Sequence, residues 1–161
     1  MKILGIDPGT TRIGYGVIDA EGANLKYLSS GLLKITSSDK EKRLLELATE
    51  YEMLLKKEKP DLVSLEKLYF AKNVKTGMEV AQSRGVLIFL TKQNKIPLVE
   101  FSPSEVKMNV AGSGNADKSA VGKMVRLILK TDEIKGPDDV FDAVAIAIAA
   151  ANNVKITKLT S

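Results

Sequence analysis

The sequence contains no cysteine and no histidine. Without cysteine the chain has no disulfide framework and no thiolate metal site, which is consistent with the reducing conditions of the cytoplasm. The absence of histidine removes the side chain that most often serves as a general base and as a metal ligand. Any hydrolytic chemistry must therefore use carboxylates, lysine or tyrosine.

Long hydrophobic runs are also absent. The longest apolar run is AVAIAIAAA (143–151), which is far shorter than the ~20 residues that a helix needs to span a bilayer. The N-terminal segment does not have the pattern of a signal peptide. These observations predict a cytoplasmic protein with no membrane partner.

Arginine is scarce among the basic residues. The chain carries 24 lysines and arginines against 20 acidic residues, for a net charge of +4, and only four of the 24 are arginine. A basic chain favours a polyanionic partner such as nucleic acid. Lysine contacts phosphate as a point charge, whereas bidentate recognition of bases favours arginine. We therefore expect recognition of nucleic-acid backbone and shape rather than of base sequence.

The pattern of apolar residues and chain breakers predicts a single α/β domain. Strands are expected in five segments: 2–7, 13–19, 24–36, 62–68 and 96–101. Helices are expected at 39–59 (capped by Ser38), at 74–93, from Pro103, after Asn115 and from Pro137. Three strands followed by alternating helices and strands indicate a mixed five-stranded sheet with helices on both faces.

Acidic residues recur at the ends of the expected strands and at the start of the last helix. Asp7 ends the first strand and Glu66 lies near the end of the fourth, at the edge where α/β sheets place their functional sites. Asp138, Asp139 and Asp142 fall in the first two turns of the last helix. Acids at a helix start also complement the helix dipole, and this alternative explains Asp138 and Asp139 better than Asp142.

A divalent cation would allow these acids to lie close together. Two like charges ~4 Å apart cost about 4 kcal/mol at an effective dielectric constant near 20, and a bound cation removes that repulsion. Ligation by oxygen alone favours Mg²⁺ or Mn²⁺ over Zn²⁺. Two such ions can activate a water molecule and stabilise a leaving oxygen in phosphodiester hydrolysis. On spacing alone, a set of scattered structural acids remains an open alternative.

Four separated segments together resemble a known family. IDPGTTRIGYGVID, SLEKLYFAKN, EVKMNVAGSGNADKSAVGKMV and DVFDAVAIAIA are similar, in order and spacing, to the RuvC family of Holliday junction resolvases. The resemblance covers about residues 2–150 of a single nuclease domain (1–161) and leaves 151–161 as a C-terminal tail. It implies a ribonuclease H-like fold. It also implies that the family's four catalytic metal ligands correspond to Asp7, Glu66, Asp139 and Asp142.

The resemblance further implies residues that bind DNA. Lys107 and Lys118 match two lysines that the family uses against DNA and at the active centre, while a solvated helix lysine is the alternative for Lys107. The family's aromatic residue after the glutamate, which meets bases at the junction centre, matches Tyr69. Phe70 is a substitute for that role, and Tyr69 could instead be a core residue at the strand end. Lys72, in the same segment, is a further DNA-binding candidate.

The implied activity is that of a crossover junction endodeoxyribonuclease, which resolves Holliday junctions by paired symmetric nicks in recombination and repair. The implied cofactor is Mg²⁺, or Mn²⁺, with two ions per active site. Paired nicks require two active sites related by a two-fold axis, which implies a homodimer. In the family the helix expected at 74–93 makes this contact, with Met78, Val86 and Phe89 as candidates. The branch-migration proteins RuvA and RuvB are the implied cellular partners.

Two functions from other classes remain open. The IDPGTT segment also resembles the first phosphate-binding loop of actin-like ATPases and sugar kinases. Such proteins place ATP between two related domains, and the sequence has neither a second phosphate loop nor an adenosine site. The other alternative is a module that binds branched DNA without cutting it, and the presence of all four matched acids argues against that.

Overall fold

The structure is a computed structural model that describes residues 1–68 and 74–160. The described residues form a five-stranded sheet in the order β3-β2-β1-β4-β5. The strands are β1 (Lys2–Asp7), β2 (Gly14–Glu21), β3 (Asn24–Leu32), β4 (Leu62–Glu66) and β5 (Leu98–Phe101). Neighbours among the first three strands are antiparallel, whereas β4 runs parallel to β1 and β5 runs parallel to β4. The predicted mixed five-stranded sheet is confirmed.

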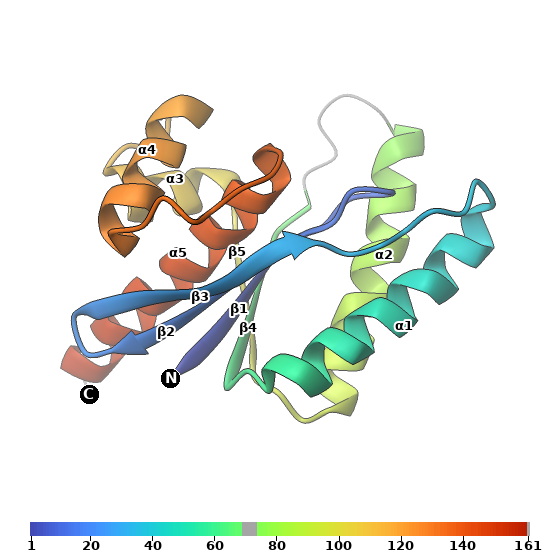
Figure 1. Cartoon of the computed structure of the whole chain (residues 1–161), viewed down its shortest axis with the longest axis horizontal. Helices are drawn as coiled ribbons and strands as arrows, with labels where there is room; N and C mark the ends of the chain where they lie inside the picture. Colours follow the sequence, from blue (N-terminus) through green and yellow to red (C-terminus); the bar gives the residue numbers. More distant parts are fainter. Residues whose placement is uncertain (69–73, 161) are drawn as a thin grey trace.

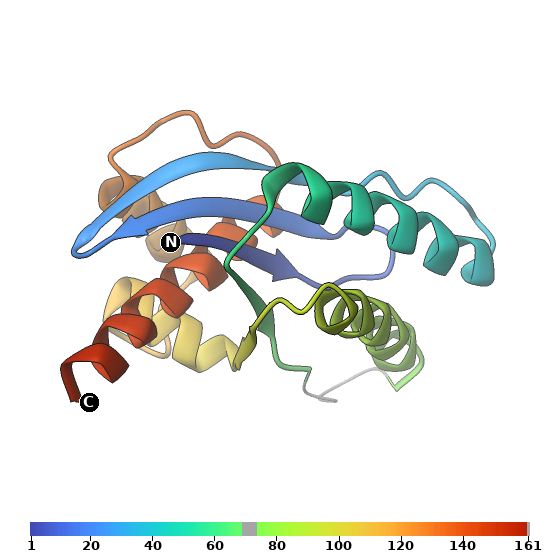
Figure 2. The same ribbon diagram turned by 90° about the horizontal axis from the view of Figure 1, so that it is seen from below.

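Helices cover both faces of this sheet (Figure 1, Figure 2). They are α1 (Lys40–Glu58), α2 (Val74–Gln93), α3 (Pro103–Ala111), α4 (Lys118–Leu129) and α5 (Asp138–Thr160). α1 and α2 lie on one face, and α5 crosses the other face with α3 and α4 packed beside it. Residues 151–160 continue α5. Within the described ranges, no helix is both long and apolar enough to cross a bilayer.

α5 contacts the sheet backbone to backbone at two glycines. A Cβ atom on Gly14 of β2 would lie 2.0 Å from the carbonyl oxygen of Asp139, and one on Gly5 of β1 would lie 2.1 Å from that of Ala143. Only glycine permits an approach this close. Gly14 is the pairing partner of Asp7 across the β1–β2 ladder. The first turns of α5 are therefore held beside the end of β1.

The third strand is shorter than the sequence predicts. β3 ends at Leu32 instead of residue 36. The backbone N–H groups of Thr36 and Ser37 donate to the carboxylate of Glu46, at 2.7 and 3.1 Å, instead of to a neighbouring strand. A side chain from α1 thus replaces the ladder at this point.

The prediction that Ser38 caps the first helix is wrong. The N-cap is Asp39, whose carboxylate accepts a hydrogen bond from the backbone N–H of Lys42 at 2.8 Å. The fourth strand is also two residues shorter than expected, because β4 ends at Glu66. Glu66 is therefore the last residue of its strand, as Asp7 is of β1.

Candidate active site

Four acids from three elements line one pocket at the edge of the sheet. β1 and β4 are adjacent and parallel, with Ile6 paired to Leu65, so Asp7 and Glu66 leave the sheet at the same edge. The contact of α5 with Gly14 brings the first turns of that helix to this edge. The pocket has a volume of about 320 Å³, and its ionisable lining residues are Asp7, Glu66, Lys107, Lys118, Asp139 and Asp142.

Burial and mutual repulsion oppose the ionisation of these acids. Burial raises the pKa of Asp7 to about 8, and the charges of Glu66, Asp142 and Asp139 contribute to the shift. The positive charge of Lys118 acts in the opposite direction. Burial is also the largest cause of the raised pKa of Glu66 and of Asp142. A cation bound in the pocket would remove the repulsion and favour the ionised forms.

Two basic side chains pair with acids of α5. The Nζ atom of Lys118, in the first turn of α4, lies 3.3 Å from Oδ2 of Asp142 and 3.8 Å from Oδ2 of Asp138. The attraction of Asp142 is the largest cause of the raised pKa of Lys118. The guanidinium of Arg12, in the turn after β1, lies 2.5 Å from Oδ2 of Asp139. These pairs offset part of the negative charge of the pocket.

The donor set fits a hard divalent cation in its chemistry. All four acids offer carboxylate oxygen, which Mg²⁺ and Mn²⁺ prefer. Among residues 1–68 and 74–160, however, no three acidic side chains are arranged as a finished metal site. Asp139 and Asp142 instead face Arg12 and Lys118. Cation binding therefore requires these two carboxylates to exchange partners.

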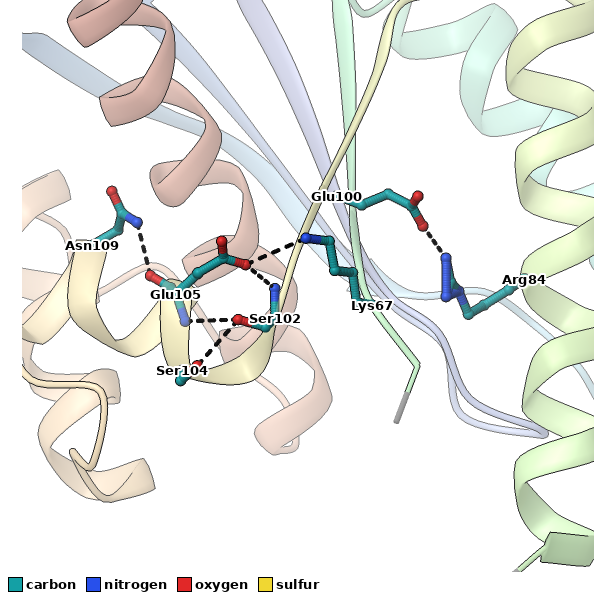
Figure 3. Close-up of polar contacts among 7 residues, drawn as sticks. All are labelled: Lys67, Arg84, Glu100, Ser102, Ser104, Glu105 and Asn109. Atoms are coloured by element: carbon teal, nitrogen blue, oxygen red, sulfur yellow. Dashed lines mark hydrogen bonds and ion pairs between the residues drawn. The ribbon is translucent and has the colours of Figure 1, made fainter. Parts of the chain in front are cut away.

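The neighbourhood of Glu66 is held by polar contacts at the start of α3 (Figure 3). Ser102 caps this helix, and its side chain and that of Glu105 form a reciprocal capping box. The Nζ atom of Lys67, which follows Glu66, lies 3.7 Å from the carboxylate of Glu105. These contacts connect the end of β4 to α3, the helix that presents Lys107 to the pocket.

Two arginines near the acids are not identified from the sequence. Arg84 on α2 pairs with Glu100 on β5 (Figure 3), and its positive charge opposes the rise that burial causes in the pKa of Glu66. The sequence around Arg84 does not indicate a role near the site, because its partner Glu100 lies on another element and is an acid of a kind that is common on protein surfaces. Arg12 carries a usable signal, since an arginine in the turn directly after a strand-end aspartate lies near the site of that aspartate.

The residues predicted from the sequence fall into three groups. Six of them come together in the pocket: Asp7, Glu66, Lys107, Lys118, Asp139 and Asp142. The side chain of Asp138 is 75% exposed and lines a neighbouring groove instead. Tyr69, Phe70 and Lys72 lie outside the described residues.

Comparison with known proteins identifies relatives over almost the whole chain. A sequence model of the family described as crossover junction endodeoxyribonuclease RuvC matches residues 3–150. RuvC of Thermosipho melanesiensis is 44% identical over 151 residues, which cover 91% of this chain and 94% of the relative. RuvC of Caldicellulosiruptor saccharolyticus is 41% identical, with 92% of this chain and 90% of the relative covered.

Solved structures give the same assignment. RuvC of Thermus thermophilus superposes with a TM-score of 0.88 at 29% identity, covering 98% of this chain and 97% of that one. T. thermophilus RuvC in complex with a Holliday junction substrate superposes with a TM-score of 0.89 at 28% identity, covering 98% and 96%. The expected ribonuclease H-like fold of this family is confirmed. The chain belongs to the RuvC family of crossover junction endodeoxyribonucleases. The kinase-type alternative is not favoured.

Proposed function

We propose that this chain resolves Holliday junctions by paired symmetric nicks during DNA recombination and repair. The observation that carries the proposal is the convergence of four acids and two lysines, from five elements, in one pocket. Membership of the RuvC family supports it, as does the similarity to a T. thermophilus RuvC in complex with a Holliday junction substrate. The expected products carry a 5′-phosphate and a 3′-hydroxyl, which a ligase can join.

Asp7, Glu66, Asp139 and Asp142 are the residues proposed to hold two Mg²⁺ ions per active site, with Mn²⁺ as a substitute. When bound, the ions supply an activated water and stabilise the leaving oxygen of the phosphodiester. Asp7 must release its proton to act as a ligand, against the burial that raises its pKa to about 8. The role proposed for the carboxylates is to hold and orient the ions at the scissile phosphate.

Lys107 and Lys118 are proposed to hold the scissile phosphate at the acids. Lys107 is half-buried in the wall of the pocket, and its charge offsets part of the rise that burial causes in the pKa of Glu66. The Nζ atom of Lys118 lies 3.3 Å from Oδ2 of Asp142. A phosphate that enters the pocket competes for the Lys118 ammonium group and frees the Asp142 carboxylate. Substrate binding and completion of the ligand set are therefore coupled through Lys118.

The proposed assembly is a homodimer of single-domain protomers (1–161) that acts in the cytoplasm with RuvA and RuvB. Two opposed strands can be cut together only if two active sites face them across a two-fold axis. α2 is the proposed contact helix, because Met78 and Phe89 expose 60% and 63% of their surface on it. Val86, the third candidate, is half-buried.

Cleavage of a synthetic four-way junction in Mg²⁺ tests the proposal. Asp7→Asn and Glu66→Gln should abolish nicking but leave junction binding in EDTA intact. Glu21→Gln is a matched control, because Glu21 is an exposed acid at the other end of β2. Loss of binding together with loss of fold in both site variants would mean that these acids are structural. A wild-type protein that binds junctions and leaves them uncut would favour the binding-module alternative.

A further inference from the structure

A second groove adjoins the acidic pocket. It lies between α4 and the first turns of α5, has a volume of about 270 Å³, and shares Lys118 and Asp142 with the pocket. The rest of its α4 wall consists of Ser119, Gly122, Lys123 and Arg126. The pocket and the groove therefore meet at Lys118 and Asp142. The groove is thus continuous with the site of the proposed cleavage.

Three basic residues of α4 line the groove. They are Lys118, Lys123 and Arg126, and around the helix axis Arg126 lies between the other two, at about 80° from Lys118 and about 60° from Lys123. Lys123 is exposed, and its side chain has no hydrogen bond or ion pair to any residue in the described ranges. On the facing wall Asp138 is partly neutralised by Lys118 at 3.8 Å. Lys123 is therefore available to an external anion.

Arg126 and Phe141 form the floor of the groove. The guanidinium carbon of Arg126 lies 4.9 Å from the centroid of the Phe141 ring. The same guanidinium donates to the carbonyl oxygen of Ile134 at 3.1 Å and lies 3.6 Å from Asp132. Arg126 is thus paired with protein partners and packs over the ring. The ring offers an apolar surface beside two cationic groups.

Gly122 keeps the groove open. It lies inside α4, where glycine is less favourable than any residue except proline. A Cβ atom at this position would have only Phe141 Cδ1 within 4.0 Å. An added Cβ atom would therefore fit without displacing the backbone, and a longer side chain would project beside the Phe141 ring. The missing side chain leaves space for a ligand rather than for packing.

We propose that this groove is a second backbone-binding site for the DNA strand, in which Lys123 contacts a phosphate next to the scissile one and Phe141 contacts a deoxyribose. The inference rests on the proposed function, because it takes the strand in the groove to be the one cut in the pocket. DNA fits better than a small anion, because the groove is open to the pocket and combines cationic groups with an apolar ring. Lys118, at the boundary, would contact the strand as it passes from one site to the other.

Single neutral linkages in the substrate test this contact. A four-way junction with one methylphosphonate, moved stepwise along the strand from the cut site, is titrated with protein in EDTA, and affinity is read by fluorescence anisotropy. In the wild-type protein, a methylphosphonate at one position next to the scissile phosphate should lower the affinity for the junction. The Lys123→Ala variant should bind the unmodified junction more weakly, and a methylphosphonate at that same position should not lower its affinity further. Lys56→Ala, a lysine 69% exposed on α1, should retain the wild-type pattern.

Gly122→Leu provides a test that misfolding cannot imitate. Leucine should raise the melting temperature, because it replaces glycine inside a helix, yet it should weaken junction binding several-fold by filling the groove. Normal affinity in this variant, or the same phosphate dependence in Lys123→Ala and Lys56→Ala, would overturn the proposal even if the wild-type protein cuts junctions. A wild-type protein that binds with the predicted dependence on Lys123 but does not cut would overturn only the proposed function.

Discussion

The ion pair between Arg12 and Asp139 joins the turn after β1 to the first turn of α5, with 2.5 Å between Nη2 and Oδ2. Asp138, one residue earlier, is turned away from the pocket, and its side chain is 75% exposed. Two adjacent aspartates of one helix therefore have different surroundings. Asp139 faces the acids at the end of the sheet, whereas Asp138 faces the neighbouring groove.

The first prediction follows from this difference. Asp139→Asn should lower Mg²⁺-dependent cleavage of a four-way junction by more than ~100-fold, since even indirect partners of metal ligands cost 10–100-fold. Asp138→Asn should cut at close to the wild-type rate and lose only ~0.3–1 kcal/mol of stability through its effect on the helix dipole. Single-turnover cleavage and thermal melts of both variants give the comparison. The reverse pattern would mean that Asp138 is the ligand.

A second prediction concerns pH and the unusual acid at the end of β1. Burial raises the pKa of Asp7 to about 8, whereas the unfolded chain has the ordinary value near 3.8. Between about pH 4 and pH 8 the folded protein holds a proton that the unfolded chain has released, so the free energy of unfolding falls as pH rises through this range. Asp7→Asn removes this loss. In EDTA, its melting temperature relative to the wild type should therefore increase from pH 5 to pH 8.

Addition of Mg²⁺ at pH 8 should reverse this order, because the ion binds only the protein that retains its ligands. The wild-type protein should gain in melting temperature and Asp7→Asn should gain little. A difference between the two proteins that does not change with pH in EDTA would contradict the raised pKa of Asp7. Equal stabilisation by Mg²⁺ would contradict its role as a ligand.

A third prediction separates DNA contacts from solvated lysines. Lys107→Ala and Lys118→Ala should each weaken junction binding and reduce the slope of log K against log salt by about 0.9, the value for one phosphate contact. Cleavage should also slow, because both lysines line the pocket of the acids. Lys56→Ala is again the control. If both variants kept the wild-type salt dependence of binding and cut normally, the two lysines would instead be solvated surface residues.

The fourth prediction concerns assembly. The protein should have a mass near twice 17.4 kDa in sedimentation equilibrium at micromolar concentration. Phe89→Asp places a charge on the exposed apolar face of α2 and should shift the protein toward the monomer. Met53→Asp, at a residue 61% exposed on α1, is the matched control and should remain dimeric.

The consequence for cleavage follows from the two-site mechanism. The Phe89→Asp variant should still nick one strand of a junction at a time, but the two nicks of one junction should no longer occur in the same encounter. A supercoiled plasmid that extrudes a cruciform distinguishes these cases, because paired nicks linearise it and single nicks relax it. Paired cleavage by a strictly monomeric wild-type protein would contradict the assembly.

The sheet and its acidic residues could be predicted from the sequence, because local features of the sequence encode them. Asp7 and Glu66 follow apolar strands, and a parallel pairing places both at one edge. The cap of α1 was not accessible, because Ser38 and Asp39 are both good capping residues. The choice of Asp39 goes with contacts upstream of the helix, where the Ser37 hydroxyl accepts a hydrogen bond from the Asp39 N–H at 3.1 Å.

Long-range ion pairs are the other part that local patterns do not encode. Arg12 and Asp139 are 127 residues apart in the chain, and Arg84 and Glu100 are 16 apart on different elements. Any exposed arginine can pair with many acids, so the partner is determined only when the helices are docked. For the same reason, helix geometry alone does not distinguish Asp138 from Asp139, and only the resemblance to the RuvC family favours Asp139.

The direct contact of α5 with the glycines of β1 and β2 has a consequence for tolerance to mutation. Gly14 touches the carbonyl of Asp139, and Gly5 touches that of Ala143, with no side chain between helix and strand. The separation between the acids of the helix and Asp7 is therefore a dimension of the main chain, insensitive to the sizes of core side chains elsewhere. Substitutions in the core between the sheet and helices α1 and α2 should alter the stability of the enzyme without altering its cleavage reaction. A single methyl group added at position 14 should instead alter cleavage, because it would push α5 away from the strand and increase the separation between Asp7 and the acids of the helix.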